Sequence, residues 1–380
     1  MHAAMYAYPW DLVEEGVETV AGRLQHAGLD TITVAASYHA GKFLRPHAPQ
    51  RKVYFPEDGT VYFRPRMERY GHIKPRVNTM VAEFDALRML EREAPGLRRI
   101  AWTVGLHNTP LGTQHPEMVA RTAFGDPLYN SLCPSHPAVR EYLVALCTDL
   151  GTDHALSGIA IEAPGWQAFR HGYHHEFELI ELGPRAETML GMCFCDACRG
   201  RAEADGIDVD RLGARTRSEL EDFLLHGRQP ETDPETDPDW QAFIAFRARV
   251  VTSLVGEVRQ ALAAEVELAI IPTVLSPNDR CWLEGSDLAA LALAANRLEV
   301  PAYQTGPAAI ALDIAAVREK AGAAAPLGFI LRPSFPNLRD ADEVNAAVRT
   351  VRTADAKSIS FYNYGHIRLE SLDWIRAALG

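Results

Sequence analysis

The chain alternates between short apolar runs and longer stretches in which apolar residues recur at helical spacing. The longer stretches predict helices, among them 12–27, which ends before Gly28, 137–149 and 240–264. The apolar runs predict strands at 5–10, 31–38, 99–106, 158–163, 267–274, 299–304, 327–333 and 358–364. Strands alternating with helices are typical of parallel β/α units, and eight strands close a barrel. The pattern therefore predicts an α/β fold, with residues 1–380 forming one (β/α)₈ TIM-barrel domain.

An open, doubly wound parallel sheet is the competing fold. A nucleotide-binding version of that sheet has a glycine-rich phosphate loop after its first strand. No such loop follows residues 5–10. We therefore favour the barrel.

Two long insertions interrupt the alternation. Residues 39–80 follow the second predicted strand and contain a hairpin-like pattern over 52–63. Residues 164–240 follow the fourth strand, hold a cluster of cysteines and end in a polar, turn-rich segment at 230–238, which we expect to be an exposed linker. Loops that follow barrel strands lie on the catalytic face, so we expect 39–80 to cover the barrel mouth.

Composition narrows the class of protein. Hydrophobic residues make up 47% of the chain and charged residues 23%, as in globular proteins. A net charge of −12 argues against nucleic-acid binding. No apolar run is long enough to span a membrane, and no signal-peptide pattern opens the sequence, so we expect a cytoplasmic protein. A homo-oligomer is compatible with the sequence.

Three cysteines are closely spaced, because Cys193, Cys195 and Cys198 form a C-x-C-x-x-C pattern. A tetrahedral zinc site would need one more ligand, and Cys133 lies in the loop after the preceding predicted strand. Four thiolates would leave no open position, so the ion would be structural. The alternative is a set of ordinary buried thiols.

The order of these features resembles a known family. Cys133-Pro134, a predicted helix, a strand ending in Glu162 and then C-x-C-x-x-C are similar to the zinc-bearing bacterial β-galactosidases of glycoside hydrolase family 42, mainly over residues 99–200. The resemblance implies that the four cysteines hold zinc near the active site and that Glu162 is the catalytic acid/base.

The chain departs from that family at two positions. Ile161 stands where the family has an asparagine before the acid/base, and Arg332 lies near the end of strand seven, where the family has a nucleophilic glutamate. We therefore expect a divergent member of this type of barrel, and β-galactosidase specificity is not implied.

Glu162 closes the apolar run 158–161, which places it at the catalytic end of a barrel strand. A glycosidase needs a carboxyl group that stays protonated near neutral pH, and burial beside aromatic walls raises a carboxyl pKa. Trp102 and Trp166 are candidate wall residues.

Glycoside hydrolysis ordinarily uses a second carboxylate. Asp279, after the fifth predicted strand, and Glu176, after the fourth, are the candidates. Asp11 fits better as the N-cap of the first helix.

Polar and aromatic residues lie at the ends of the other predicted strands. Such side chains hold sugar rings and hydroxyl groups. The candidate substrate-binding residues are Tyr38, His39, Lys42, His107, Asn108, Tyr303, Gln304, Arg332, Tyr362 and Asn363.

The sequence therefore predicts a glycoside hydrolase or related carbohydrate-active enzyme that uses Glu162 as general acid/base and needs no organic cofactor. One alternative is a barrel that binds a sugar without hydrolysing it. Another is a lyase or isomerase in which Arg332 neutralises an anionic sugar derivative. A catalytic metal held by His39 or His174-His175 is disfavoured, because the first strand lacks His-x-His and the eighth lacks Asp.

Overall fold

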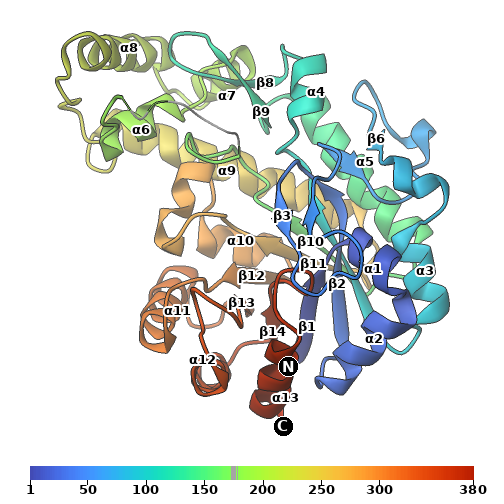
Figure 1. Ribbon diagram of the computed structural model, residues 1–380. Coiled ribbons are helices and arrows are strands. Elements are labelled where there is room, and N and C mark those ends of the chain that lie inside the picture. Colours follow the sequence, from blue (N-terminus) through green and yellow to red (C-terminus); the bar gives the residue numbers. More distant parts are fainter. Residues whose placement is uncertain (173–176, 178) are drawn as a thin grey trace.

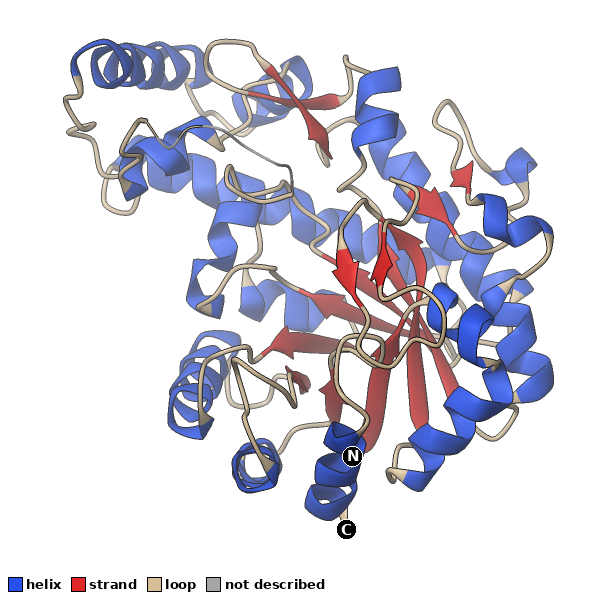
Figure 2. Cartoon of the chain, viewed as in Figure 1, coloured by secondary structure: helices blue, strands red, loops and turns tan. Residues whose placement is uncertain are grey.

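Eight parallel strands form a closed ring at the centre of the computed structural model, which describes residues 1–172, 177 and 179–380 (Figures 1 and 2). The first strand pairs with both the second and the last, which closes the ring. The predicted (β/α)₈ barrel is confirmed. In chain order the barrel strands are β1 (His2–Ala7), β2 (Thr31–Tyr38), β7 (Arg98–Val104), β10 (Gly158–Glu162), β11 (Glu267–Ile271), β12 (Arg297–Pro301), β13 (Leu327–Leu331) and β14 (Ser358–Phe361).

Helices surround the strands and complete the β/α units (Figure 2). In the first half of the chain they are α1 (Pro9–Glu15) and α2 (Val17–His26) after β1, α3 (Ala86–Glu93) after β2, and α4 (Thr109–Gln114) and α5 (Pro137–Asp153) after β7. Four helices follow β10, namely α6 (Pro184–Leu190), α7 (Asp196–Ala204), α8 (Val209–His226) and α9 (Pro238–Ala261). One helix follows each remaining strand: α10 (Leu288–Ala294), α11 (Pro307–Ala321), α12 (Ala341–Thr353) and α13 (Glu370–Leu379).

The alternation of side chains along β10 aims its last residue into the barrel. Ile159 and Ile161 belong to the large core between strands and helices, whereas Ala160 packs in a separate interior cluster with Ile100 and Ala269. Successive side chains of a strand point to opposite faces. Glu162 therefore shares the inner face with Ala160, at the carboxyl end of the strand.

A buried polar network occupies the interior near the start of several strands. The Glu299 carboxylate accepts hydrogen bonds from Arg297 Nε at 2.8 Å and from Ser358 Oγ at 2.9 Å. Because its oxygens are used in this network, Glu299 has a structural role in the barrel.

The N-terminal β/α unit differs in detail from the prediction. The first strand ends at Ala7, and Pro9 opens α1, because proline suits the first turn of a helix. Asp11 is not the N-cap. It lies in the first turn of α1, where its carboxylate accepts the backbone N–H of Tyr8 at 3.1 Å. The single helix predicted over 12–27 is broken at Gly16, whose φ is 85°.

The hairpin predicted within 52–63 is wrong. β4 (Val53–Tyr54) pairs with β3 (Phe43–Leu44), whereas β5 (Thr60–Val61) pairs with β2 and with β6 (Arg76–Val77). The turn-rich residues between the two runs therefore separate strands of different sheets. Two 3₁₀ turns, Met67–Arg69 and Thr79–Ala82, complete this insertion.

The second insertion is largely helical, and its polar end packs against the protein. Pro230 and Pro234 are buried, and Asp237 caps α9 while pairing with Arg215 at 2.6 Å. The segment 230–238 is thus anchored at several points. In the described part of the chain, no helix has the length and apolarity needed to cross a membrane.

Candidate active site

A pocket of about 190 Å³ opens at the carboxyl ends of the barrel strands. It takes residues from all eight of the β/α units, as expected for the catalytic face of this fold. The lining residues are Tyr6, Tyr38, His39, Trp102, Glu162, His171, Ile271, Thr273, Val274, Pro301, Tyr303, Ile330, Arg332 and Tyr362.

Glu162 is partly exposed to this pocket and otherwise enclosed. Burial raises the pKa of its carboxyl to about 7, and a hydrogen bond from Trp102 opposes that increase. The Trp102 Nε1–H donates to Glu162 Oε2 at 2.6 Å from the neighbouring strand β7. A carboxyl with this pKa can both donate and accept a proton near neutral pH.

The backbone bends sharply directly after Glu162. Ala163 has a φ of 40°, a left-handed conformation that is unfavourable for a residue with a Cβ. Its N–H donates to the Ile271 carbonyl at 2.9 Å, which holds the bend against β11. Strain of this kind is often found at functional sites.

Three tyrosines form a hydroxyl cluster on one wall. The Tyr8 hydroxyl donates to Tyr38 Oη at 3.1 Å and lies 2.9 Å from Tyr362 Oη. Burial raises the pKa of all three hydroxyls, so they remain protonated. Tyr38 and Tyr362 line the pocket and can exchange hydrogen bonds with a hydroxyl-rich ligand, while the buried Tyr8 lies outside the lining.

Arg332 provides positive charge on another wall. Its guanidinium carbon lies 3.8 Å from the centroid of the Tyr303 ring and 5.3 Å from that of Tyr362. The Nε atom is buried without a hydrogen-bond partner. In the residues that the structure describes, no carboxylate forms an ion pair with this arginine.

Three imidazoles lie together beside the mouth, where His39 stacks on His107 and His171 meets His107 edge-on. His39 and His171 line the pocket, and His107 lies between them, with ring centroids 4.3 Å and 5.3 Å from theirs. Burial lowers the pKa of each ring, that of His171 to about 4. The cluster is therefore neutral at pH 7, when each ring can donate one hydrogen bond and accept another.

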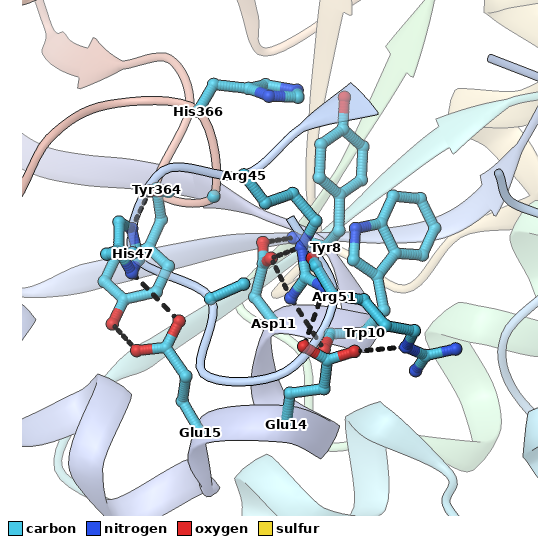
Figure 3. A network of polar contacts seen from close by, with 12 residues as sticks. Tyr8, Trp10, Asp11, Glu14, Glu15, Arg45, His47, Arg51, Tyr364 and His366 are labelled. Atoms are coloured by element: carbon cyan, nitrogen blue, oxygen red, sulfur yellow. Dashed lines mark hydrogen bonds and ion pairs between the residues drawn. The ribbon is translucent and has the colours of Figure 1, made fainter. Parts of the chain in front are cut away.

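The insertion after β2 is anchored to α1 by buried ion pairs (Figure 3). Arg45 is almost fully buried and lies 3.1 Å from Asp11 and 2.8 Å from Glu14. Glu14 also pairs with Arg51 at 2.6 Å, and His47 lies 3.0 Å from Glu15. These contacts fix the β3–β4 hairpin beside the barrel mouth.

Several predicted site residues lie outside the lining of the pocket. Asn108 caps α4 and donates to the Gly59 carbonyl at 3.1 Å, and Asn363 accepts the Gly365 N–H at 3.1 Å. Lys42 is exposed, and Gln304 donates to Ser276 Oγ at 2.7 Å.

Of the two candidate second carboxylates, only Asp279 belongs to the described residues, and it lies outside the lining of the pocket. Asp279 lies in the 3₁₀ turn Asn278–Glu284 and is not among the lining residues. Glu176 and the pair His174-His175 lie outside the described residues. Trp166 is fully buried 4.5 Å beneath the Arg247 guanidinium and does not line the pocket.

Several buried polar residues in or beside the pocket were not predicted from the sequence. Tyr6 and Tyr8 alternate along and just beyond β1, a period-two signal that could have identified them as inward-facing. Glu284, a fully buried carboxyl, accepts the Val274 N–H at 3.3 Å behind the wall, and burial raises its pKa to about 8. Neither Glu284 nor His171 carries a strand-end signal, because Glu284 ends the 3₁₀ turn after β11 and His171 lies in the loop after β10.

The four cysteines predicted to share an ion lie together. Cys133 follows β9 (Pro127–Leu132), which forms a hairpin with β8 (Val119–Arg121), and Cys195 begins α7. The Cys133 sulfur is 3.4 Å from that of Cys198, 3.5 Å from Cys195 and 3.9 Å from Cys193. Sulfurs around a tetrahedral zinc lie about 3.8 Å apart. The buried thiols thus fit such an ion.

Comparison with solved structures finds the same barrel in several enzymes. The catalytic domain of a β-amylase from Paenibacillus polymyxa has a TM-score of 0.63 and 10% identity, with 100% of this chain and 97% of that chain covered. An α-L-fucosidase isoenzyme from Paenibacillus thiaminolyticus has a TM-score of 0.56 and 12% identity, with 100% and 49% covered. A β-galactosidase from the psychrophilic Marinomonas ef1 has a TM-score of 0.57 and 11% identity, with 99% and 58% covered.

The chain thus spans about half the length of that fucosidase. No protein-family model matches the chain, and no curated protein sequence matches it. At these identities the similarity shows the fold alone, which is a barrel of the type found in glycoside hydrolases.

Proposed function

We propose that the protein is a carbohydrate-active enzyme, most simply a glycoside hydrolase, in which Glu162 is the general acid/base. The observation that carries this proposal is the Glu162 carboxyl in the pocket, with a pKa of about 7 and an indole N–H fixing one oxygen. Tyrosine hydroxyls and neutral imidazoles around it suit a ligand rich in hydroxyl groups.

In this proposal the protonated Glu162 donates its proton to the oxygen that leaves the sugar while a second carboxylate bonds to the anomeric carbon, and the Glu162 carboxylate then activates the water that releases the sugar from that second carboxylate. Within the described residues, Glu162 is the one carboxyl group that lines the pocket. A second carboxylate would come from Glu176 or from a movement of Asp279. If neither participates, a sugar-binding barrel without hydrolysis becomes the better description.

Replacing Glu162 by glutamine tests the assignment. General acid catalysis contributes about 10²–10⁴ in rate, so E162Q should lose at least 10²-fold on an oligosaccharide with a poor leaving group. It should lose less on a 4-nitrophenyl glycoside, whose leaving group departs without a proton. Glu257→Gln is the control, since this carboxylate of α9 pairs with Arg140 and does not line the pocket. Equal rates for E162Q and the wild type would remove Glu162 from the mechanism.

One observation favours a second candidate, a lyase or isomerase acting on an anionic sugar derivative. The Arg332 guanidinium lines the pocket without an ion-pair partner in the described structure, so a substrate carboxylate could neutralise it. Arg332→Gln should then weaken turnover of uronic-acid oligosaccharides at least tenfold more than that of neutral ones. An unsaturated product would identify elimination, whereas a reducing sugar formed by addition of water would identify hydrolysis.

We also propose that Cys133, Cys193, Cys195 and Cys198 hold one structural zinc ion, as in the zinc-bearing β-galactosidases that the sequence resembles. The fully buried Arg247 supports this proposal. Its guanidinium interacts electrostatically with three of the cysteines, and in the described part of the chain it forms no ion pair with a carboxylate. A zinc ion with four thiolates carries two negative charges, which this cation would partly balance.

A further inference from the structure

A second group of metal-ligating side chains lies outside the pocket lining and shares no residue with the four cysteines, although the Cys133 N–H donates to the carbonyl of Met118, which follows Glu117. The nearest donor atoms of His72, His115 and Glu117 all lie within 4.8 Å of one another. The Nδ1 atom of His115 is 3.8 Å from Glu117 Oε1. The two imidazole rings are 5.1 Å apart at an interplanar angle of 63°, so they do not stack face to face.

His115 and Glu117 are held by one turn. His115 directly follows α4, and the Met118 N–H donates to its carbonyl at 3.0 Å. Pro116 occupies the second position of this turn, where its fixed φ limits the conformations available. The turn therefore presents a nearly buried imidazole and an exposed carboxylate close together.

His72 comes from the insertion 39–80 and is held by buried neighbours. Tyr70 and Ile73 are 3% and 1% exposed, and the Tyr70 hydroxyl donates to Asp149 Oδ2 at 2.9 Å. The backbone on both sides of His72 is thus fixed to the body of the protein, while the His72 side chain remains exposed. The fold thus brings His72 next to two ligands that lie more than 40 residues further along the chain.

We propose that His72, His115 and Glu117 form a binding site for one divalent transition-metal ion, with zinc as the ion that fits best. Two imidazole nitrogens and one carboxylate oxygen are a donor set that suits zinc and not magnesium or calcium, which prefer oxygen ligands. Ligand atoms around a tetrahedral zinc lie about 3.3 Å apart. Rotation of the exposed His72 and Glu117 side chains would close the present spacing.

Such an ion would have two consequences. Three protein ligands leave a fourth position for water, in contrast to the closed shell of four thiolates. The ion would also join the insertion 39–80 to the segment between β7 and α5. Binding to the folded state alone would therefore stabilise the protein.

Zinc titration of matched variants tests this site. The wild type, H72A, E117Q and the control H226A, which removes an exposed histidine at the end of α8, are each brought to equilibrium with the same free zinc concentration, and bound zinc is counted per chain. The cysteines are present in all four proteins, so their contribution cancels. We expect the wild type and H226A to bind one zinc more than H72A and E117Q.

Thermal unfolding provides the second measurement. Added zinc should raise the Tm of the wild type and of H226A by more than it raises that of H72A or E117Q, while all four have similar Tm values in a chelator. Equal zinc content and equal zinc-induced shifts in all four proteins would overturn the proposal. Because no residue is shared with the pocket, this result is independent of the outcome for Glu162.

Discussion

The protonation of Glu162 depends on two opposing influences within a few ångströms. Enclosure among aromatic side chains favours the neutral acid, and the Trp102 N–H favours the carboxylate. The first influence is larger, which is why the pKa lies near 7. Each influence can be altered by changing a single residue.

Trp102→Phe should therefore raise the pKa of Glu162 further, because it removes the donor that stabilises the carboxylate. A hydrogen bond to a charged group is worth about 1.5–3 kcal/mol, which corresponds to an increase of about one to two pKa units. The alkaline limb of the pH–rate profile should move upward by that amount. Trp166→Phe is the control, since its indole does not line the pocket. Identical limbs in the wild type and W102F would contradict this explanation.

The sequence predicted those site residues whose side-chain direction is set by a barrel strand. Glu162, Trp102, Tyr303 and Tyr362 could be placed because apolar runs indicate where barrel strands end. His171 and Glu284 could not, because their positions depend on how irregular segments pack. Lys42 was predicted to reach the pocket because it follows the same strand as His39. It lies outside the pocket lining and is exposed.

At the scale of elements, the order of strands and helices was predictable, and their bounds were less so. Aromatic side chains continue past the end of β1 because Tyr8 and Trp10 pack in a buried cluster with Tyr38 and Trp102, and Val274 beyond β11 lines the pocket. The helical spacing of apolar residues predicted one helix over 12–27, although Gly16 divides this segment. β4 forms its hairpin with the preceding strand β3, whereas β5 pairs with the barrel strand β2, and this longer-range pairing cannot be read from a local hairpin pattern.

Gly16→Ala should destabilise the protein, because φ of 85° with ψ of 137° is a conformation that residues with a Cβ rarely adopt. The expected loss is about 1–3 kcal/mol in the free energy of unfolding. Gly22→Ala within α2 is the control. Nothing lies within 4 Å of the added Cβ there, and alanine favours helix by about 0.5–1 kcal/mol. Urea denaturation of the two variants should show shifts of opposite sign.

At the scale of the whole molecule, the barrel carries two long insertions whose attachment differs. The first is fixed to α1 by the ion pairs of Arg45. The second contains α6, α7 and α8 and meets the hairpin β8–β9 at the four cysteines. We expect the zinc proposed for those cysteines to stabilise this contact.

Removal of that zinc should lower the stability of the protein. The wild type should contain one zinc more per chain than C198S, and C198S should unfold at a lower temperature, because the remaining buried thiolates lose a ligand partner. C147S is the control, since this buried cysteine lies outside the cluster. Equal zinc content in C198S and the wild type would exclude the four-cysteine site.

The pH dependence of kcat/KM tests the role of Glu162 most directly. With a natural oligosaccharide found by screening, the wild-type value should fall about tenfold per pH unit above an apparent pKa near 7, because a general acid acts only when protonated. The residual activity of E162Q should lack this limb. A wild-type profile that stays flat between about pH 6 and 9, or an E162Q profile that keeps the same limb, would contradict Glu162 as the proton donor.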